Sequence, residues 1–147
     1  MGAGAVAVLS RGEKGRAMTP EAAKALFATE LAAFAAKYPR AKGCQFAIRA
    51  KHFLPNPDPR DLAWYDPDAH TVTLTRAALD RSNGCILGII RHELGHASDP
   101  KVEVDRGCER RADHIAEDVT GKPMRYTADG VQHATHGTVG RPEWLPQ

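Results

Sequence analysis

Residues 83–98 read NGCILGIIRHELGHAS, and this strongly apolar stretch decides the fold. Its apolar side chains recur at a spacing that predicts one broad buried helix face; they are Ile86, Leu87, Ile89, Ile90 and Leu94. The helix should end near Asp99, because Pro100 restricts the backbone of the residue before it. The sequence therefore predicts a buried helix from Asn83 to about Asp99.

The same stretch carries His92, Glu93 and His96 in an HExxH arrangement. Two histidines four residues apart share one helix face, about 6 Å apart along the axis, so both imidazoles can reach one ion. Glu93 projects beside them, where it can accept a proton from metal-bound water. Gly95 leaves room for another element at a cost of about 1 kcal/mol of helix propensity. A chance motif on a solvated helix is the alternative, but a buried cluster of this kind is costly unless it binds something.

A catalytic zinc ion usually takes three protein ligands, so a further ligand is needed. The arrangement with a third ligand six residues after the second histidine fails, because Val102 occupies that position. Glu109 is the better candidate. Asp113 lies one helical turn further on the same face, where it can orient a histidine through its second ring nitrogen. The alternative for both acids is a solvated face beside Arg110 and Arg111.

Asp99 is the rival third ligand, because it could share the face of His92 and His96. Its other interpretation is a turn-forming residue before Pro100. These two interpretations stay open at the level of the sequence.

The remaining segments predict a small α+β domain around the central helix. We expect a helix capped by Thr19 and ended before Pro39, a strand over Cys44–Ala50, a hairpin of Leu62–Tyr65 and His70–Thr75, and a helix from Asp105 to about Thr120. Residues 1–17 are expected to form a Gly-rich flexible leader, with Met18 a candidate initiator. Residues 18–147 form the single domain, and its tail from about residue 122 is expected to be mostly loop.

Composition narrows the classes of function. The formal net charge is +2, which is too small to indicate a nucleic-acid partner. The sequence contains no stretch as long as a membrane span and no signal peptide, so we expect a cytoplasmic protein. Three cysteines with no CxxC pair do not suggest a disulfide framework, which agrees with a reducing compartment.

His92-Glu93-Leu94-Gly95-His96 followed by Glu109-Arg110-Arg111-Ala112-Asp113 resembles the HExxH plus ExxxD pattern of gluzincin metallopeptidases. The resemblance covers roughly residues 44–120, and in size and layout the chain is similar to the small phage- and mobile-element-encoded peptidases. It implies a minimal zincin-like fold with a mostly antiparallel three-stranded sheet, and His70–Thr75 as the edge strand that pairs with substrate.

The resemblance also implies zinc-dependent hydrolysis of a peptide or protein substrate. Zn²⁺ is then held by His92, His96 and Glu109, with Glu93 as the base and Asp113 supporting a ligand histidine. The tail offers three candidate donors to the transition state, each of which could instead be a surface loop residue; they are Tyr126, His133 and His136.

Two other functions remain open. One is a deformylase-type amide hydrolase that uses Cys85 as a ligand, although about 10 Å of helix axis separates Cys85 from His92. The other is a catalytically silent, zinc-stabilised binding or regulatory module.

Overall fold

The computed structural model describes residues 18–50, 62–101, 107–128 and 130–134. Three helices and two small sheets make up this part of the chain, so the predicted α+β class is confirmed. The expected leader over residues 1–17 lies outside the described residues. Among the helices that the structure describes, none combines the length and the apolar character needed to cross a bilayer.

The first helix, α2 (Pro20–Lys37), begins where the sequence predicts it. Thr19 Oγ1 accepts a hydrogen bond from Ala22 N at 3.1 Å, and Pro20 occupies the first turn. Phe27 and Phe34 are buried on its inner face. Ahead of the helix, the backbone N–H of Met18 donates to Leu79 O at 2.8 Å, which ties the start of the domain to its core.

The three-stranded sheet is mixed, which corrects the expectation of a mostly antiparallel sheet. β1 (Gln45–Arg49) pairs in parallel with β3 (Thr71–Thr75), and β2 (Ala63–Asp66) pairs with β3 antiparallel. The strand order β1-β3-β2 also makes β3 the central strand, so the prediction of an edge strand at His70–Thr75 was wrong. Alternation along a strand reports its buried face but not its neighbours, so the sequence could not reveal this order.

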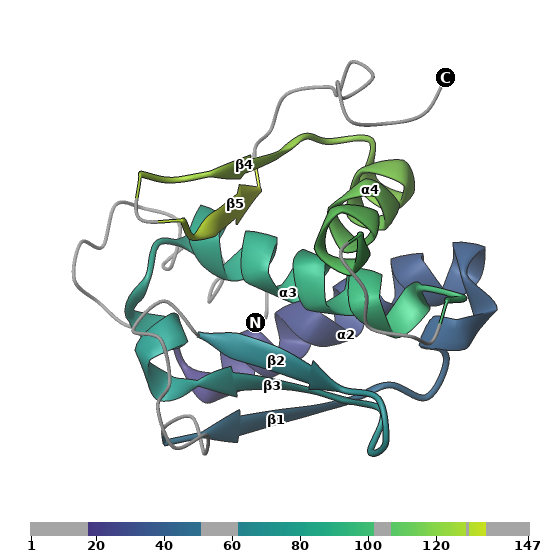
Figure 1. The fold of residues 1–147 in the computed structure, drawn as a ribbon. Coiled ribbons are helices and arrows are strands. Elements are labelled where there is room, and N and C mark those ends of the chain that lie inside the picture. Colours follow the sequence, from purple (N-terminus) through teal and green to yellow (C-terminus); the bar gives the residue numbers. More distant parts are fainter. Residues whose placement is uncertain (1–17, 51–61, 102–106, 129, 135–147) are drawn as a thin grey trace.

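The central helix, α3 (Asn83–Ser98), lies across the middle of the molecule, as Figure 1 shows. The three-stranded sheet lies on one side of it, and the opposite side is covered by α4 (Cys108–Thr120) and a small hairpin. Ser82 caps α3 by accepting a hydrogen bond from Cys85 N at 3.2 Å. Twelve of its sixteen residues are buried, which agrees with a helix enclosed by other elements on several sides.

The C-terminal segment contains more structure than expected. β4 (Met124–Tyr126) and β5 (Gln132–Ala134) pair antiparallel, and β5 packs on α3 while β4 contacts α4, although the sequence predicts mostly loop here. Strands of three residues are too short to show a period, so only packing reveals them. Two short 3-10 helices, η1 (Pro39–Ala41) and η2 (Arg76–Asp80), complete the described elements.

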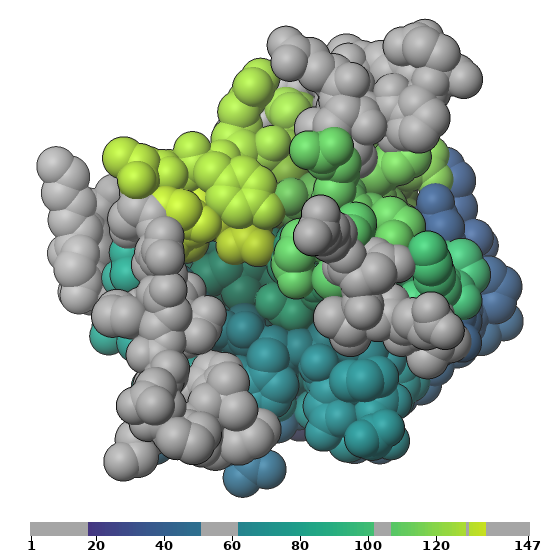
Figure 2. Space-filling model, in the orientation of Figure 1, coloured from purple at the N-terminus to yellow at the C-terminus, as the bar shows by residue number. Residues whose placement is uncertain are grey.

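The third helix begins at Cys108, after Gly107, and ends at Gly121 in a left-handed conformation with φ of 68°. The predicted cap at Asp105 lies outside the described residues, while the predicted stop is confirmed. Between the β4–β5 hairpin and the three-stranded sheet the surface is hollowed, as Figure 2 shows.

Candidate metal centre

Gly95 allows α4 to approach α3 closely enough to build a shared site. A Cβ atom at this position would overlap the carbonyl oxygen of Ala112 and would lie 2.8 Å from its Cα. The backbone of α4 therefore lies directly against the α3 surface, one residue before His96. The sequence predicts such an approach at Gly95, and the structure identifies α4 as the element that makes it.

This approach brings three potential ligand atoms together. His92 Nε2 lies 2.7 Å from Glu109 Oε1, His96 Nε2 lies 3.2 Å from the same oxygen, and the two Nε2 atoms lie 3.2 Å apart. His92 is buried, His96 is partly buried and Glu109 is exposed. These three side chains could hold a metal ion.

The donor set fits zinc in chemistry and in spacing. Two imidazole nitrogens and a carboxylate oxygen are common zinc ligands, at distances of about 2.0–2.2 Å. Tetrahedral ligands at such distances lie about 3.3 Å from one another. Two of the three separations here are 3.2 Å, while the separation between His92 Nε2 and Glu109 Oε1 matches a direct hydrogen bond.

Asp113 holds the far side of the His92 ring. Its Oδ1 lies 2.7 Å from His92 Nδ1, and its Oδ2 accepts a hydrogen bond from the Tyr126 hydroxyl at 2.6 Å. With Nδ1 as the donor to Asp113, Nε2 is the nitrogen that faces His96 and Glu109. Asp113 therefore orients the His92 ring toward the shared site, and the hydrogen bond from Tyr126 of β4 holds Asp113 in position.

Glu93 is buried beside the two histidines, with 8% of its surface exposed. Burial raises the pKa of its carboxyl, and although His92 and His96 lower the pKa, the net shift is upward. A carboxylate in this setting takes up a proton more readily than one in water, which suits a general base.

The histidine and carboxylate charges are coupled in the metal-free chain. Burial alone lowers the pKa of His92, but the hydrogen bonds to Asp113 and Glu109 outweigh it and raise the pKa to about 10. Hydrogen bonds from His92 and His96 hold the pKa of Glu109 well below its usual range. When His92 is protonated, its Nδ1–H donates to Asp113 and its Nε2–H donates to Glu109, so the imidazolium bridges the two carboxylates.

The structure places Asp99 in a different interaction. Its Oδ2 accepts a hydrogen bond from Arg111 Nε at 2.8 Å, and its Oδ1 accepts one from Lys101 N at 3.0 Å. Both carboxylate oxygens are thus engaged at the C-terminal end of α3, where Asp99 joins that end to α4. The group that could hold a metal contains Glu109 and does not include Asp99.

The three candidate donors from the tail fall in different places. Tyr126 reaches the site through Asp113. His133 lies at the opposite end of α3, with its ring against Gly84 and its Nε2 3.3 Å from Ser82 Oγ. His136 lies outside the described residues.

One neighbour of the candidate ligands, Cys108, was not among the predicted site residues. Cys108 is buried, and its Sγ lies 3.7 Å from Glu109 Oε2, so its thiol can donate to the oxygen that faces away from the histidines. The only signal in the sequence was adjacency to Glu109. Cys85, the ligand of the deformylase-type alternative, is not in the group that could hold a metal.

Comparison with known proteins adds no relative: no protein-family model, curated protein or solved structure matches this chain.

Proposed function

We propose that this protein is a zinc-dependent peptidase that cleaves a peptide bond with water activated by Glu93. The observation that supports this most is the convergence of His92 Nε2, His96 Nε2 and Glu109 Oε1 on one point, with Glu93 buried next to them. Zinc bound there would polarise the substrate carbonyl and make water a nucleophile near neutral pH.

The side chains around this point have distinct roles in the proposal. Glu93 removes a proton from the attacking water and returns it to the leaving amine. His92, His96 and Glu109 hold the metal, while Asp113 keeps His92 in the orientation that presents Nε2. The partly exposed His96 and the exposed Glu109 leave the site accessible from solvent.

The edge strand β2 is the proposed contact for the substrate backbone. Within the described residues β2 pairs with β3 only, so its other edge carries backbone groups that an extended peptide can bond. β2 also contacts α3, the helix that supplies both histidines. This assignment replaces His70–Thr75, which lies in the middle of the sheet.

The test combines metal analysis with cleavage of a peptide library. We expect the purified chain to hold about one zinc per molecule, and cleavage to stop with a chelator and return with zinc. Glu93→Gln should retain zinc while lowering the cleavage rate by about a thousand-fold or more, because it removes the base and keeps the shape.

Two results would contradict the proposal. Full activity in Glu93→Gln would show that Glu93 is not the general base. Stoichiometric zinc without cleavage of any library peptide would instead indicate a zinc-stabilised binding module.

A further inference from the structure

Glu117 of α4 is buried, with 6% of its surface exposed, yet only one of its two carboxylate oxygens is hydrogen-bonded within the described residues. Oε2 accepts a hydrogen bond from the backbone N–H of Met124 at 2.7 Å. Oε1 is shielded from solvent and has no hydrogen-bond partner in that part of the chain. Burial raises the pKa of this carboxyl, because the charged form loses its hydration. An apolar side chain would avoid this cost, so we look for the reason for the acid in what its hydrogen bond holds.

The bond holds the first residue of the strand that carries Tyr126. β4 contains three residues, with Met124 at its start and Tyr126 at its end. Glu117 lies one helical turn after Asp113, so both carboxylates lie on one face of α4. Glu117 binds the main chain at the start of β4, and Asp113 binds the hydroxyl of the side chain at its end. Two acids of α4 therefore fix this short strand at both ends.

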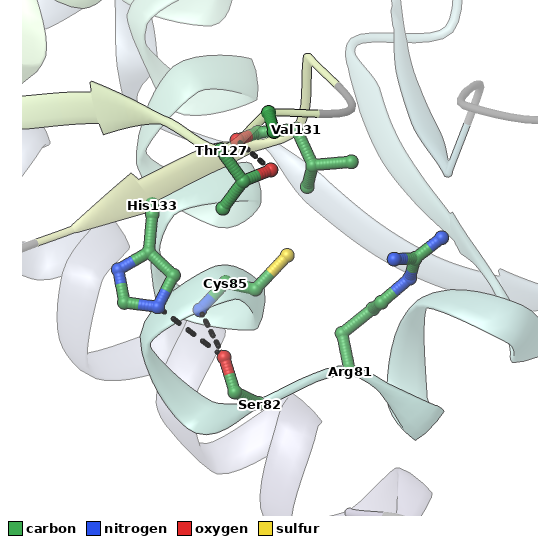
Figure 3. A pocket seen from close by; sticks show the side chains of 7 residues that line it. Arg81, Ser82, Cys85, Thr127, Val131 and His133 are labelled. Atoms are coloured by element: carbon green, nitrogen blue, oxygen red, sulfur yellow. Dashed lines mark hydrogen bonds between the residues drawn. The ribbon is translucent and has the colours of Figure 1, made fainter.

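The other strand of the hairpin lies on α3. A Cβ atom at Gly88 would lie 2.7 Å from Ala134 N, so the backbone of β5 is in direct contact with that helix. Figure 3 shows His133 of the same strand beside Ser82, and its Nε2 lies 3.3 Å from Ser82 Oγ. The hairpin therefore connects α3, which carries the two candidate histidine ligands, to α4, which carries the candidate carboxylate ligand.

The turn of the hairpin is not packed solidly against the domain. A hollow of about 460 Å³ is lined by Thr127 and Val131 on the hairpin side and by Ser82 and Cys85 at the start of α3, as Figure 3 shows. Thr127 N donates to Val131 O at 2.9 Å, which closes the turn on itself. Packing beneath the turn therefore cannot fix β4, whose position depends on its pairing with β5 and its two bonds to α4.

We propose that Glu117 is a positioning residue for the candidate metal centre. By holding Met124, it keeps β4 in place and Tyr126 within reach of Asp113. Asp113 in turn presents Nε2 of His92 to the shared site. The inference rests on the metal site of the proposed function, but it concerns affinity for zinc and does not depend on cleavage.

The experiment is a double-mutant cycle on the zinc affinity of the full chain, measured by competition with a chromophoric chelator. Glu117→Met removes the acceptor and fills the same space with an apolar side chain, so the Kd for zinc should rise about five-fold. Tyr126→Phe removes the hydroxyl bond to Asp113. If Glu117 acts through Tyr126, the double variant should bind zinc no more weakly than Tyr126→Phe alone, within about two-fold.

Two further measurements separate positioning from a merely structural role. Glu117→Gln keeps an oxygen acceptor for Met124 N, so it should restore the Kd to within about two-fold of the unaltered chain. Urea unfolding of metal-free Glu117→Met should show stability that is unchanged or higher, since a buried carboxylate has been replaced by an apolar group. A merely structural role would lower stability and zinc affinity together.

Hydrogen exchange tests the same coupling without any change at Glu117. Because coupling between two sites is reciprocal, zinc should slow exchange of the Met124 amide in the unaltered chain by about five-fold. In Tyr126→Phe, zinc should leave the exchange rate of this amide unchanged. Equal protection by zinc in both chains would show that β4 and the metal centre are not connected through Tyr126.

The outcomes separate this inference from the peptidase proposal. An unchanged Kd in Glu117→Met, or effects of the two changes that multiply in the double variant, overturns the positioning role and leaves the peptidase proposal standing. The expected coupling in a chain that binds zinc but cleaves no peptide supports the positioning role and overturns the peptidase proposal. A chain that binds no zinc overturns both.

Discussion

The hydroxyl of Tyr126 donates to Asp113 Oδ2 at 2.6 Å, while Asp113 Oδ1 lies 2.7 Å from His92 Nδ1. A residue of the C-terminal hairpin is thus connected through one carboxylate to a candidate metal ligand on α3. Partial burial and this hydrogen bond raise the pKa of Tyr126, so the phenol keeps its proton at neutral pH. Its hydrogen is directed to Asp113, which identifies Tyr126 as a positioning residue for His92.

Tyr126→Phe should therefore weaken zinc binding and leave the chemical step largely intact. Loss of one hydrogen bond to a charged carboxylate should raise the Kd for zinc by about ten-fold. At saturating zinc, kcat should stay within about two-fold of the unaltered chain. Competition with a chromophoric chelator gives Kd, and cleavage at high zinc gives kcat.

Tyr38→Phe is the control for that change. The Tyr38 hydroxyl donates a similar hydrogen bond, of 2.7 Å, to Asp118, which belongs to α4 as Asp113 does, but Tyr38 lies outside the site. It should alter neither Kd nor kcat. A large fall in kcat in Tyr126→Phe at saturating zinc would instead assign Tyr126 to the transition state.

Glu109→Gln tests the third ligand. A neutral amide of the same shape binds zinc poorly, so the Kd for zinc should rise by about 100-fold or more. Asp99→Asn is the comparison, since Asp99 pairs with Arg111 in the structure. It should lower the free energy of unfolding by about 1–3 kcal/mol and keep zinc stoichiometric. Equilibrium dialysis and urea unfolding measure the two effects, and the reverse pattern would make Asp99 the ligand.

Zinc affinity should depend on pH through His92. Its pKa, raised to about 10 in the metal-free chain by hydrogen bonds that outweigh burial, means that zinc must displace a proton at neutral pH. If zinc binding releases one proton, the apparent Kd for zinc should therefore fall about ten-fold for each unit by which the pH rises, up to about pH 10. Calorimetry in buffers of different ionisation enthalpy counts these protons, and no proton release would contradict the ion pair.

His92 also determines how the free energy of unfolding of the metal-free protein changes with pH. Because the folded pKa of His92 exceeds the unfolded value of about 6.5, the protonated ring stabilises the fold fully below pH 6.5. That contribution is lost as the pH rises through about 10. Zinc-loaded protein should not show this loss, since the metal occupies the position of the proton.

Gly95→Ala should separate the two helices that form the site. The added methyl group meets the backbone of Ala112, which cannot move without displacing α4. We expect a net loss of roughly 1–3 kcal/mol in the free energy of unfolding and weaker zinc binding, despite the better helix propensity of Ala. Gly84→Ala is the control, because its methyl group would meet the ring of His133, a side chain that can rotate. Equal effects of both changes would show that the close approach at Gly95 is unimportant.

The sequence alone predicts the helical part of this fold well. Thr19 at the start of α2 and Gly121 after α4 are local signals whose effect depends only on neighbouring residues. The spacing of His92 and His96 likewise fixes their relative position, because both belong to one helix. Such features need no knowledge of the rest of the fold.

Other features depend on contacts between distant segments. Strand alternation in Thr71–Thr75 could not show that β3 has a partner on each side, one of them parallel. The β4–β5 hairpin is stabilised by its packing on α3, and nothing in its own short strands indicated it. The choice between Glu109 and Asp99 similarly required knowing where Arg111 lies, since its guanidinium engages Asp99.

The glycines of α3 also bear on the order in which the molecule assembles. Gly84, Gly88 and Gly95 together cost about 3 kcal/mol of helix propensity relative to alanine, so this segment is a weak helix in isolation. Its partners must dock before it becomes rigid, which excludes α3 as an autonomous folding nucleus. The ligand pair should therefore acquire its spacing late in folding, and zinc should bind a chain that has already collapsed.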